Sequence, residues 1–186
     1  MSFVTTLPSS PVDGQEVYYQ SATAGGGGTN TMADVGAVWH LRYRAASSSA
    51  YKWEFVGGTS ISHSAPGGTT GPGGTFAALA SGSAPVIVLP AAGDYILEYG
   101  ENSLSNVNSD GQREANMAPV ATGLTAGTAG SYGRLIILAA HYEKGGAHFQ
   151  YRATGISGTA TLHFLSATYP TIHNLLYLTV QPIRVG

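Results

Sequence analysis

The sequence contains no cysteine and very little charge. Without cysteine, disulfides, thiolate metal sites and cysteine nucleophiles are excluded. Charged residues make up 10% of the 186 residues, where about 25% is usual, and the net charge is −2. A weakly acidic chain has no general attraction for phosphate backbones, so we expect no nucleic-acid partner. So few charges also indicate that partner subunits cover much of the surface.

Long apolar runs and secretion signals are also missing. The longest apolar run, residues 135–140, is the size of a strand and too short for a membrane helix. Residues 1–8 have neither a basic segment nor an apolar segment of a signal peptide. We therefore expect a protein that is made in a cytoplasm, is not secreted and does not insert into a membrane.

Helical periodicity is nearly absent as well. No segment of ten or more residues combines apolar spacing at i, i+3, i+4 and i+7 with freedom from Gly and Pro. Short runs rich in Val, Ile, Tyr, Phe and Trp recur instead, bounded by Gly, Pro, Asn, Asp and Ser. The sequence therefore predicts an all-β protein.

The first 58 residues predict a three-stranded antiparallel meander, with strands at 16–20, 38–44 and 51–56. Alternation gives these strands one polar face and one aromatic face. The aromatic face carries Trp39, Leu41, Tyr43, Tyr51, Trp53 and Phe55. Three strands cannot bury such a face among themselves, so these six residues need a second layer, either from residues 76–186 or from a partner protein. We favour the partner protein, because large aromatics dominate interface energetics. Residues 1–58 would then be an attachment module.

Two further regions follow. Residues 59–75 hold Gly-Gly pairs and two prolines, Pro66 and Pro72, and predict a flexible linker with no helix or central strand. Residues 76–186 predict a second β unit, a β-sandwich of the jelly-roll kind. Its strands at 148–153 and 160–166 are expected to be separate, with a Gly-rich turn at 155–158 between them.

Histidine offers the one metal candidate. His141, His148 and His163 lie on predicted strands, and Glu143 could complete a zinc or iron site. No HxH or HExxH spacing supports it, and histidines are common at strand ends. We therefore expect no metal.

Catalytic and cofactor motifs fail in the same way. There is no Gly-x-Ser-x-Gly elbow, and the Gly-rich runs lack the Gly-Lys-Ser/Thr ending of a phosphate loop. Asp94, Glu98 and Glu101 could form a carboxylate cluster for glycoside cleavage, but edge or interface charges are the simpler interpretation. We expect no enzymatic activity, no catalytic residue and no cofactor.

Three stretches of the first 58 residues resemble a known module. They are LPSSPVDGQEVYY (7–19), VWHLRYR (38–44) and YKWEFVGG (51–58). These three segments resemble a module of virion structural proteins in tailed bacteriophages, most closely those that infect actinobacteria. There the module occurs in minor tail and virion surface proteins. The chain departs from the module in its longer Gly-rich insertion at 24–36.

The remainder, with LPAAGDY (89–95) and LTVQPIRV (178–185), is similar to the jelly-roll domains of such appendages, in outline to tumour-necrosis-factor-like trimer domains. The resemblance carries no catalytic residues. It implies a non-enzymatic virion protein, a minor tail or appendage component with a host-surface-binding role. The expected partners are other virion proteins of the tail or capsid and further copies of the chain, most simply in a homotrimer. Its location would be the virion, assembled in the host cytoplasm.

Two alternatives stay open. One is a capsid decoration or head-fibre protein of the same build. The other is a carbohydrate-binding module that recognises a host cell-surface glycan through Trp39, Trp53 and the tyrosines.

Overall fold

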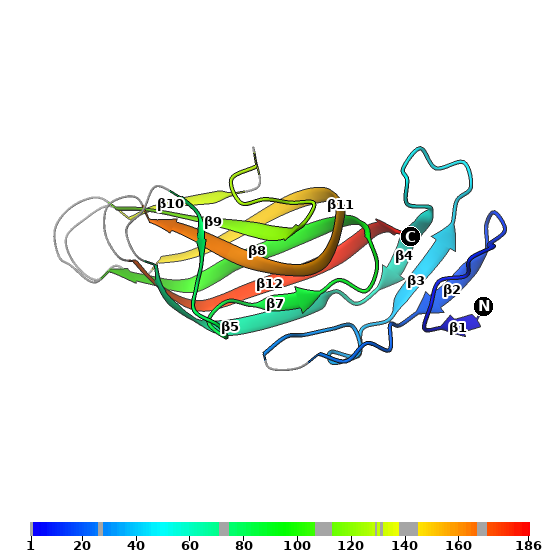
Figure 1. Cartoon of the computed structure of the whole chain (residues 1–186), viewed down its shortest axis with the longest axis horizontal. Helices are drawn as coiled ribbons and strands as arrows, with labels where there is room; N and C mark the ends of the chain where they lie inside the picture. Colours follow the sequence, from blue (N-terminus) through cyan, green and yellow to red (C-terminus); the bar gives the residue numbers. More distant parts are fainter. Residues whose placement is uncertain are drawn as a thin grey trace.

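The computed structural model describes residues 2–25, 28–70, 75–106, 113–128, 130, 132–137, 145–166 and 171–186. Every regular element in these ranges is a β-strand, which confirms the all-β prediction. The molecule is elongated, and the N- and C-terminal ends lie at the same end of the long axis (Figure 1). Among the described residues, no helix has the length and hydropathy to cross a membrane.

The described ranges contain twelve strands. They are β1 (Ser2–Val4), β2 (Glu16–Tyr19), β3 (Trp39–Tyr43), β4 (Trp53–Gly58), β5 (Ile61–Thr70), β6 (Ala77–Ala78), β7 (Val86–Val88), β8 (Gly93–Asn106), β9 (Arg113–Thr122), β10 (Gly133–Ile137), β11 (Gly145–Ser166) and β12 (Thr171–Val185).

The predicted meander is present. Strands β2, β3 and β4 pair antiparallel in sequence order, and β1 adds to β2 in parallel. Alternation places Trp39 and Leu41 of β3 in the interior, while His40 and Arg42 of the same strand point outward. The predicted strands and the predicted division into two faces are therefore confirmed.

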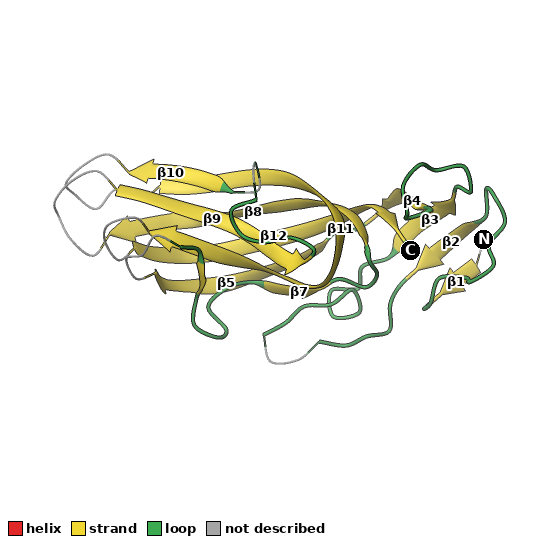
Figure 2. Cartoon of the chain, turned by 45° about the horizontal axis from the view of Figure 1, so that its top comes forward, coloured by secondary structure: helices red, strands yellow, loops and turns green. Residues whose placement is uncertain are grey.

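The sandwich consists of two sheets (Figure 2). The first sheet has the order β5-β12-β8-β11, and the second has the order β7-β11-β9-β10, with β6 pairing with β11 beyond the residues that pair with β7. From β5 onward, consecutive strands lie in opposite sheets, with two exceptions: β6 and β7 share the second sheet, and so do β9 and β10. Strands β5 to β12 thus form two sheets that share β11, which confirms the predicted β-sandwich.

Strand β11 belongs to both sheets. Residues 145–156 pair with β8, and residues 157–166 pair with β9. The register shifts where the strand passes from one sheet to the other, and Gly155 and Gly158 have φ of 67° and 70° there. The predicted turn at 155–158 is thus wrong. The two glycines bend one continuous strand, because a bulge accepts positive φ without ending the ladder.

The predicted linker is also wrong over residues 61–70, which form β5. This strand pairs with β12 alone, so it is an edge strand, where Pro66 needs no second ladder partner. Gly67 has φ of 92°, and a Cβ there would lie 2.0 Å from the carbonyl oxygen of His173. Gly67, which contributes to the linker-like composition, therefore allows β5 and β12 to approach each other closely.

The meander and the sandwich are joined into one body. The end of β12 pairs with β4, with Arg184 opposite Glu54 and Val185 opposite Trp53. One continuous hydrophobic core contains buried side chains from both parts. The predicted division into an independent attachment module and a separate sandwich is therefore not what the chain forms.

The β2–β3 segment, residues 20–38, reinforces this joint. Its Asn30 forms backbone hydrogen bonds with β7, from Asn30 N to Val86 O (2.9 Å) and from Val88 N to Asn30 O (3.0 Å). The Asn30 amide donates to Ser62 O at 2.9 Å, so the residue bridges edge strands of both sheets. Met32 is fully buried in the core. The Gly-rich insertion thus closes one edge of the sandwich.

Candidate functional site

Five of the six residues predicted to bind a partner belong to the core or pack against it, and the sixth is Tyr51. Trp39 and Leu41 are fully buried and Trp53 is 3% exposed. Tyr43, Tyr51 and Phe55 are half-buried. The prediction was right that this face needs a second layer but wrong about its source, because the chain supplies that layer itself.

Trp39 shows how the layer is built. Its ring lies between Tyr19 and Tyr95, with ring centroids 6.1 and 6.2 Å away. Its indole N–H donates to Thr59 O at 3.0 Å. Tyr95 belongs to β8, so a series of tilted aromatic contacts crosses from the meander into the sandwich. Trp39, which is fully buried, is therefore unavailable to a partner or to a sugar.

The outer face of the meander carries a row of exposed rings. Phe3 of β1, Tyr18 of β2 and His40 of β3 are cross-strand neighbours, and we call them the aromatic row. The ring centroids lie 5.8 Å apart for Phe3 and Tyr18, and 5.2 Å apart for Tyr18 and His40. Phe3 is 66% exposed and Tyr18 is 38% exposed. An open aromatic row of this kind suits a protein contact.

A second row on the same face is ionic. Glu16, Arg42, Glu54 and Arg184 face one another across β2, β3, β4 and β12, and we call them the charge row. Arg42 binds Glu16 through Nε at 2.6 Å, and Arg184 lies 3.5 Å from Glu54. Hydrogen bonds from Arg42 and then from His40 hold the pKa of Glu16 below its usual value. The signs alternate along the row, so the face has oriented charge but little net charge.

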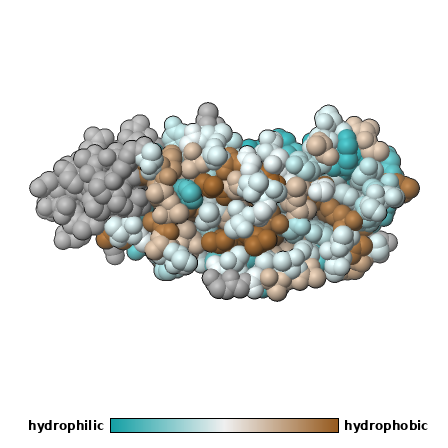
Figure 3. Space-filling model, in the orientation of Figure 1, coloured by the Kyte–Doolittle hydropathy of each residue, from teal (hydrophilic) through white to brown (hydrophobic). Residues whose placement is uncertain are grey.

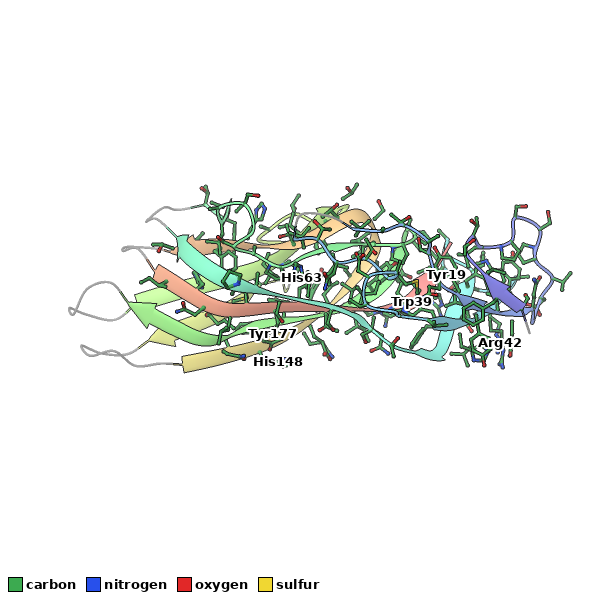
Figure 4. The ribbon with its side chains drawn as sticks, turned by 90° about the horizontal axis from the view of Figure 1, so that it is seen from below. Tyr19, Trp39, Arg42, His63, His148 and Tyr177 are labelled. Carbon is green, nitrogen blue, oxygen red and sulfur yellow. The ribbon has the colours of Figure 1, made fainter. Side chains whose placement is uncertain are left out.

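The outer face of the first sheet is different in chemistry. The phenol of Tyr177 on β12 extends across Gly100 of β8 and reaches His148 of β11. Figure 4 shows Tyr177 and His148 beside each other on this face. The side chains around them are mainly hydroxyls, amides and one carboxylate, Glu98.

The two candidate metal residues that the structure describes, His148 and His163, do not lie together. His148 lies on the outer face of the first sheet, whereas His163 pairs with Ala118 and Ala78 in the second sheet. His141 and Glu143 lie outside the described residues. In the described ranges, no group of three or more His, Cys, Asp or Glu residues could hold a metal ion.

The candidate carboxylates are also separated. Asp94 is buried and accepts hydrogen bonds from the Ser49 hydroxyl and from Gly155 N, both at 3.1 Å. Glu98 points out of the sheet. Glu101 points inward, where its carboxylate lies 3.0 Å from His173 Nδ1, and both side chains are almost completely buried. Burial raises the pKa of Glu101. These three carboxylates therefore share no cleft.

Two shallow hollows flank Leu7 and Gly186 at the meander end. The larger, about 470 Å³, is lined mainly by hydroxyl-bearing and small residues and includes Tyr19. The Tyr19 hydroxyl donates to Pro90 O at 3.0 Å, and burial raises its pKa. The smaller, about 340 Å³, includes Lys52 as its one charged side chain. Neither hollow pairs an acid with a base or a nucleophile.

The sequence matches no family model and no curated protein. The candidate surfaces are therefore the two outer faces: the aromatic and charge rows of the meander, and the region around Tyr177 on the sandwich. The sequence analysis singled out His148 only as a metal candidate and did not identify Phe3, Tyr18 and Tyr177 as surface groups. Strand alternation could have indicated them, since each lies opposite in phase to the buried residues of its strand.

Proposed function

We propose that the protein is a non-enzymatic structural protein of a tailed-bacteriophage virion, a minor tail or appendage component. The observation that carries the proposal is the fold of the three stretches that resemble virion proteins. Residues 16–19, 39–43 and 53–58 within them form one unit, the meander β2–β4. This unit forms one end of the elongated molecule, and the jelly roll extends away from it (Figure 1).

The outer face of the meander is the proposed docking surface for other virion proteins. The aromatic row supplies exposed apolar area, and the charge row beside it supplies a fixed pattern of alternating charge. Large aromatics provide most of the binding energy at protein interfaces, while ordered charges set orientation. This face replaces the inward aromatic face as the attachment surface.

Assembly with further copies of the chain belongs to the same proposal. The visible face is mostly pale, with hydrophobic patches along the middle of the sandwich (Figure 3). A sparsely charged surface of this kind favours contact with other subunits, and a homotrimer is the simplest closed arrangement for a jelly-roll appendage. Light scattering of the purified protein should give a mass of about three chains. A stable 19.1 kDa species at micromolar concentration would contradict it.

Particle incorporation tests the proposal directly. A tagged chain is supplied during infection by the phage that encodes it, and the purified particles are quantified by mass spectrometry. A Phe3→Ser/Tyr18→Ala variant should enter particles about tenfold less than the parent. Tyr132→Ala is the matched control, because Tyr132 is also an exposed ring (47%) but lies on the sandwich.

The outcomes separate the parts of the proposal. A parent chain absent from purified particles would contradict a virion role. Equal incorporation of the double variant and the control would contradict the docking face. Immunogold labelling decides between the tail and the capsid, and label on the head would favour the decoration-protein alternative.

A further inference from the structure

The outer face of the first sheet carries a flat plate made of two rings. Tyr177 is opposite Gly100 on β8, and Gly100 is opposite His148 on β11. The Tyr177 hydroxyl lies 2.6 Å from His148 Nδ1, the ring centroids are 6.0 Å apart, and the ring planes differ by 16°. The two rings are thus nearly parallel and joined edge to edge by a hydrogen bond. We call this pair the Tyr177–His148 plate.

Gly100 allows the plate to lie against the sheet. A Cβ at this position would be 2.5 Å from the Tyr177 hydroxyl oxygen and 2.8 Å from the ring carbon that carries it. The phenol therefore lies across the strands and does not project into solvent. Burial, and then the Glu98 carboxylate, raise the pKa of Tyr177, so its hydroxyl stays protonated near neutral pH.

Polar side chains beside the plate are already oriented. Along the next cross-strand row, Ser62 and Thr179 are hydrogen-bonded at 3.0 Å. The Gln150 amide donates to Glu98 Oε1 at 2.9 Å. Each of these groups has further donor or acceptor capacity toward solvent. The plate is therefore bordered by hydroxyls, an amide and a carboxylate, all held by the sheet.

This chemistry is complementary to a sugar. A pyranose ring has an apolar C–H face that packs on an aromatic ring and a rim of hydroxyls that both donate and accept hydrogen bonds. A protein hot spot would need a cluster of large apolar groups, whereas Leu175 is the one large hydrophobic side chain more than half exposed on this sheet within the described residues. A nucleic acid would need more cations than Arg152 supplies.

We propose that the Tyr177–His148 plate is a binding site for a neutral, pyranose-containing glycan. The sugar ring stacks on the plate, and its hydroxyls bind Glu98, Gln150 and Thr179. This inference deepens the host-surface role and rests on the proposed function only for where the glycan comes from, since binding is a property of the purified chain.

The test uses the full chain on an array of neutral oligosaccharides of glucose, galactose, mannose and N-acetylglucosamine. Positive ligands are then titrated by calorimetry. The parent should bind at least one of them, and Tyr177→Ala should weaken binding about tenfold or more. Tyr177→Phe keeps the ring but loses the hydroxyl that His148 fixes, so it should weaken binding less than the alanine variant does.

Controls keep the result specific. Tyr18→Ala removes an exposed ring of the meander and should leave glycan affinity unchanged. His148→Ala removes the exposed ring of the plate and should also weaken glycan binding. It replaces Tyr177→Ala in the test if Tyr177→Ala does not fold. Each variant is compared with the parent for melting temperature and for mass by light scattering.

Three results would overturn the inference. They are no binding to any array member, equal binding by the parent and Tyr177→Ala, or a loss of oligomer mass in Tyr177→Ala, which would make the face a contact between copies of the chain. Failure here with normal particle incorporation would leave the virion role intact. Glycan binding by a chain that never enters particles would overturn the virion role alone.

Discussion

The meander and the sandwich follow the same alternation of side chains, yet their outer faces differ. The meander presents the charge row and exposed rings, whereas the described face of the first sheet is bordered by Ser, Thr and Gln side chains with Glu98 and Arg152 as its charges. Their inner faces are alike and merge in one core. Alternation therefore separates two faces in each part, but it does not determine what covers either face.

The difference fits the two contacts proposed above, with a protein at the meander and with a glycan at the sandwich. Paired charges of alternating sign restrict how a partner can be oriented, because a shifted register places like charges together. A nearly neutral hydroxyl-rich face has no such restriction and suits a polar ligand without charge. The four predictions below test whether the two regions are one folded body with two distinct surfaces.

The largest effect is expected from truncating a side chain of the core that the meander and the sandwich share. Trp39→Ala should lower the free energy of unfolding by about 3 to 5 kcal/mol, because it leaves a cavity between Tyr19 and Tyr95. Chemical denaturation followed by circular dichroism measures the loss. Tyr18→Ala, one position away from Tyr19 on the outer face, should cost about 1 kcal/mol or less. Two separate unfolding transitions in the parent would show that meander and sandwich are independent.

The β2–β3 segment gives the second test. Met32→Ala should cost about 2 to 4 kcal/mol, since the side chain is fully buried where this segment meets the sandwich. Val35→Ala is the matched control in the same segment, because Val35 is 39% exposed. It should change stability by about 0.5 kcal/mol or less. Similar losses for the two variants would mean that the segment is not anchored by Met32.

Some of this organisation was predictable from the sequence. Bulky residues alternating with polar ones identified β3 and β4 and the strand face that carries Trp39, but not that this face is covered by the chain's own sandwich. The joint was not predictable, because Gly and Pro between 59 and 75 have the composition of a linker, and an edge strand tolerates that composition where a central strand does not. The bend of β11 at Gly155 and Gly158 was missed for a similar reason, since glycines mark bulges as well as turns.

The two outer surfaces were only half predictable. The phase of each strand shows that Tyr177 and His148 point away from the core. That they meet over Gly100 depends on the pairing of three strands far apart in the sequence, and no local pattern encodes that register.

A buried acid gives the third test and distinguishes the interior of the sandwich from that of the meander. Burial raises the pKa of Glu101 above its ordinary value of 4.5, so the folded state holds this proton more tightly than the unfolded state does. The stability from this group is present below pH 4.5 and is lost as the pH rises through the higher folded pKa. Glu101→Gln removes this loss. In thermal melts, the stability of Glu101→Gln relative to the parent should therefore increase as the pH rises above 4.5. A difference that does not change with pH would contradict a raised pKa for Glu101.

The smallest effect is expected at the charge row. Glu54→Gln removes the ionic partner of Arg44, 3.2 Å away, and of Arg184. Because these pairs are partly exposed, the variant should cost about 1 kcal/mol or less, and less still in high salt. Denaturation at two salt concentrations measures both values. A loss as large as that of Trp39→Ala would mean that the row holds the fold together and is not chiefly a docking pattern.

The position of β12 has a consequence for the order in which the protein can be made. This strand lies between β4 and β5 on one side and β8 on the other. The first sheet therefore lacks an interior strand until β12, which ends at Val185, has been synthesised. During translation, β5 and β8 emerge from the ribosome before β12, so each lacks the strand with which it pairs in the folded sheet. Pairing of such distant segments is slow, and open edges invite association with other chains. The first sheet therefore forms only after translation has passed its central strand.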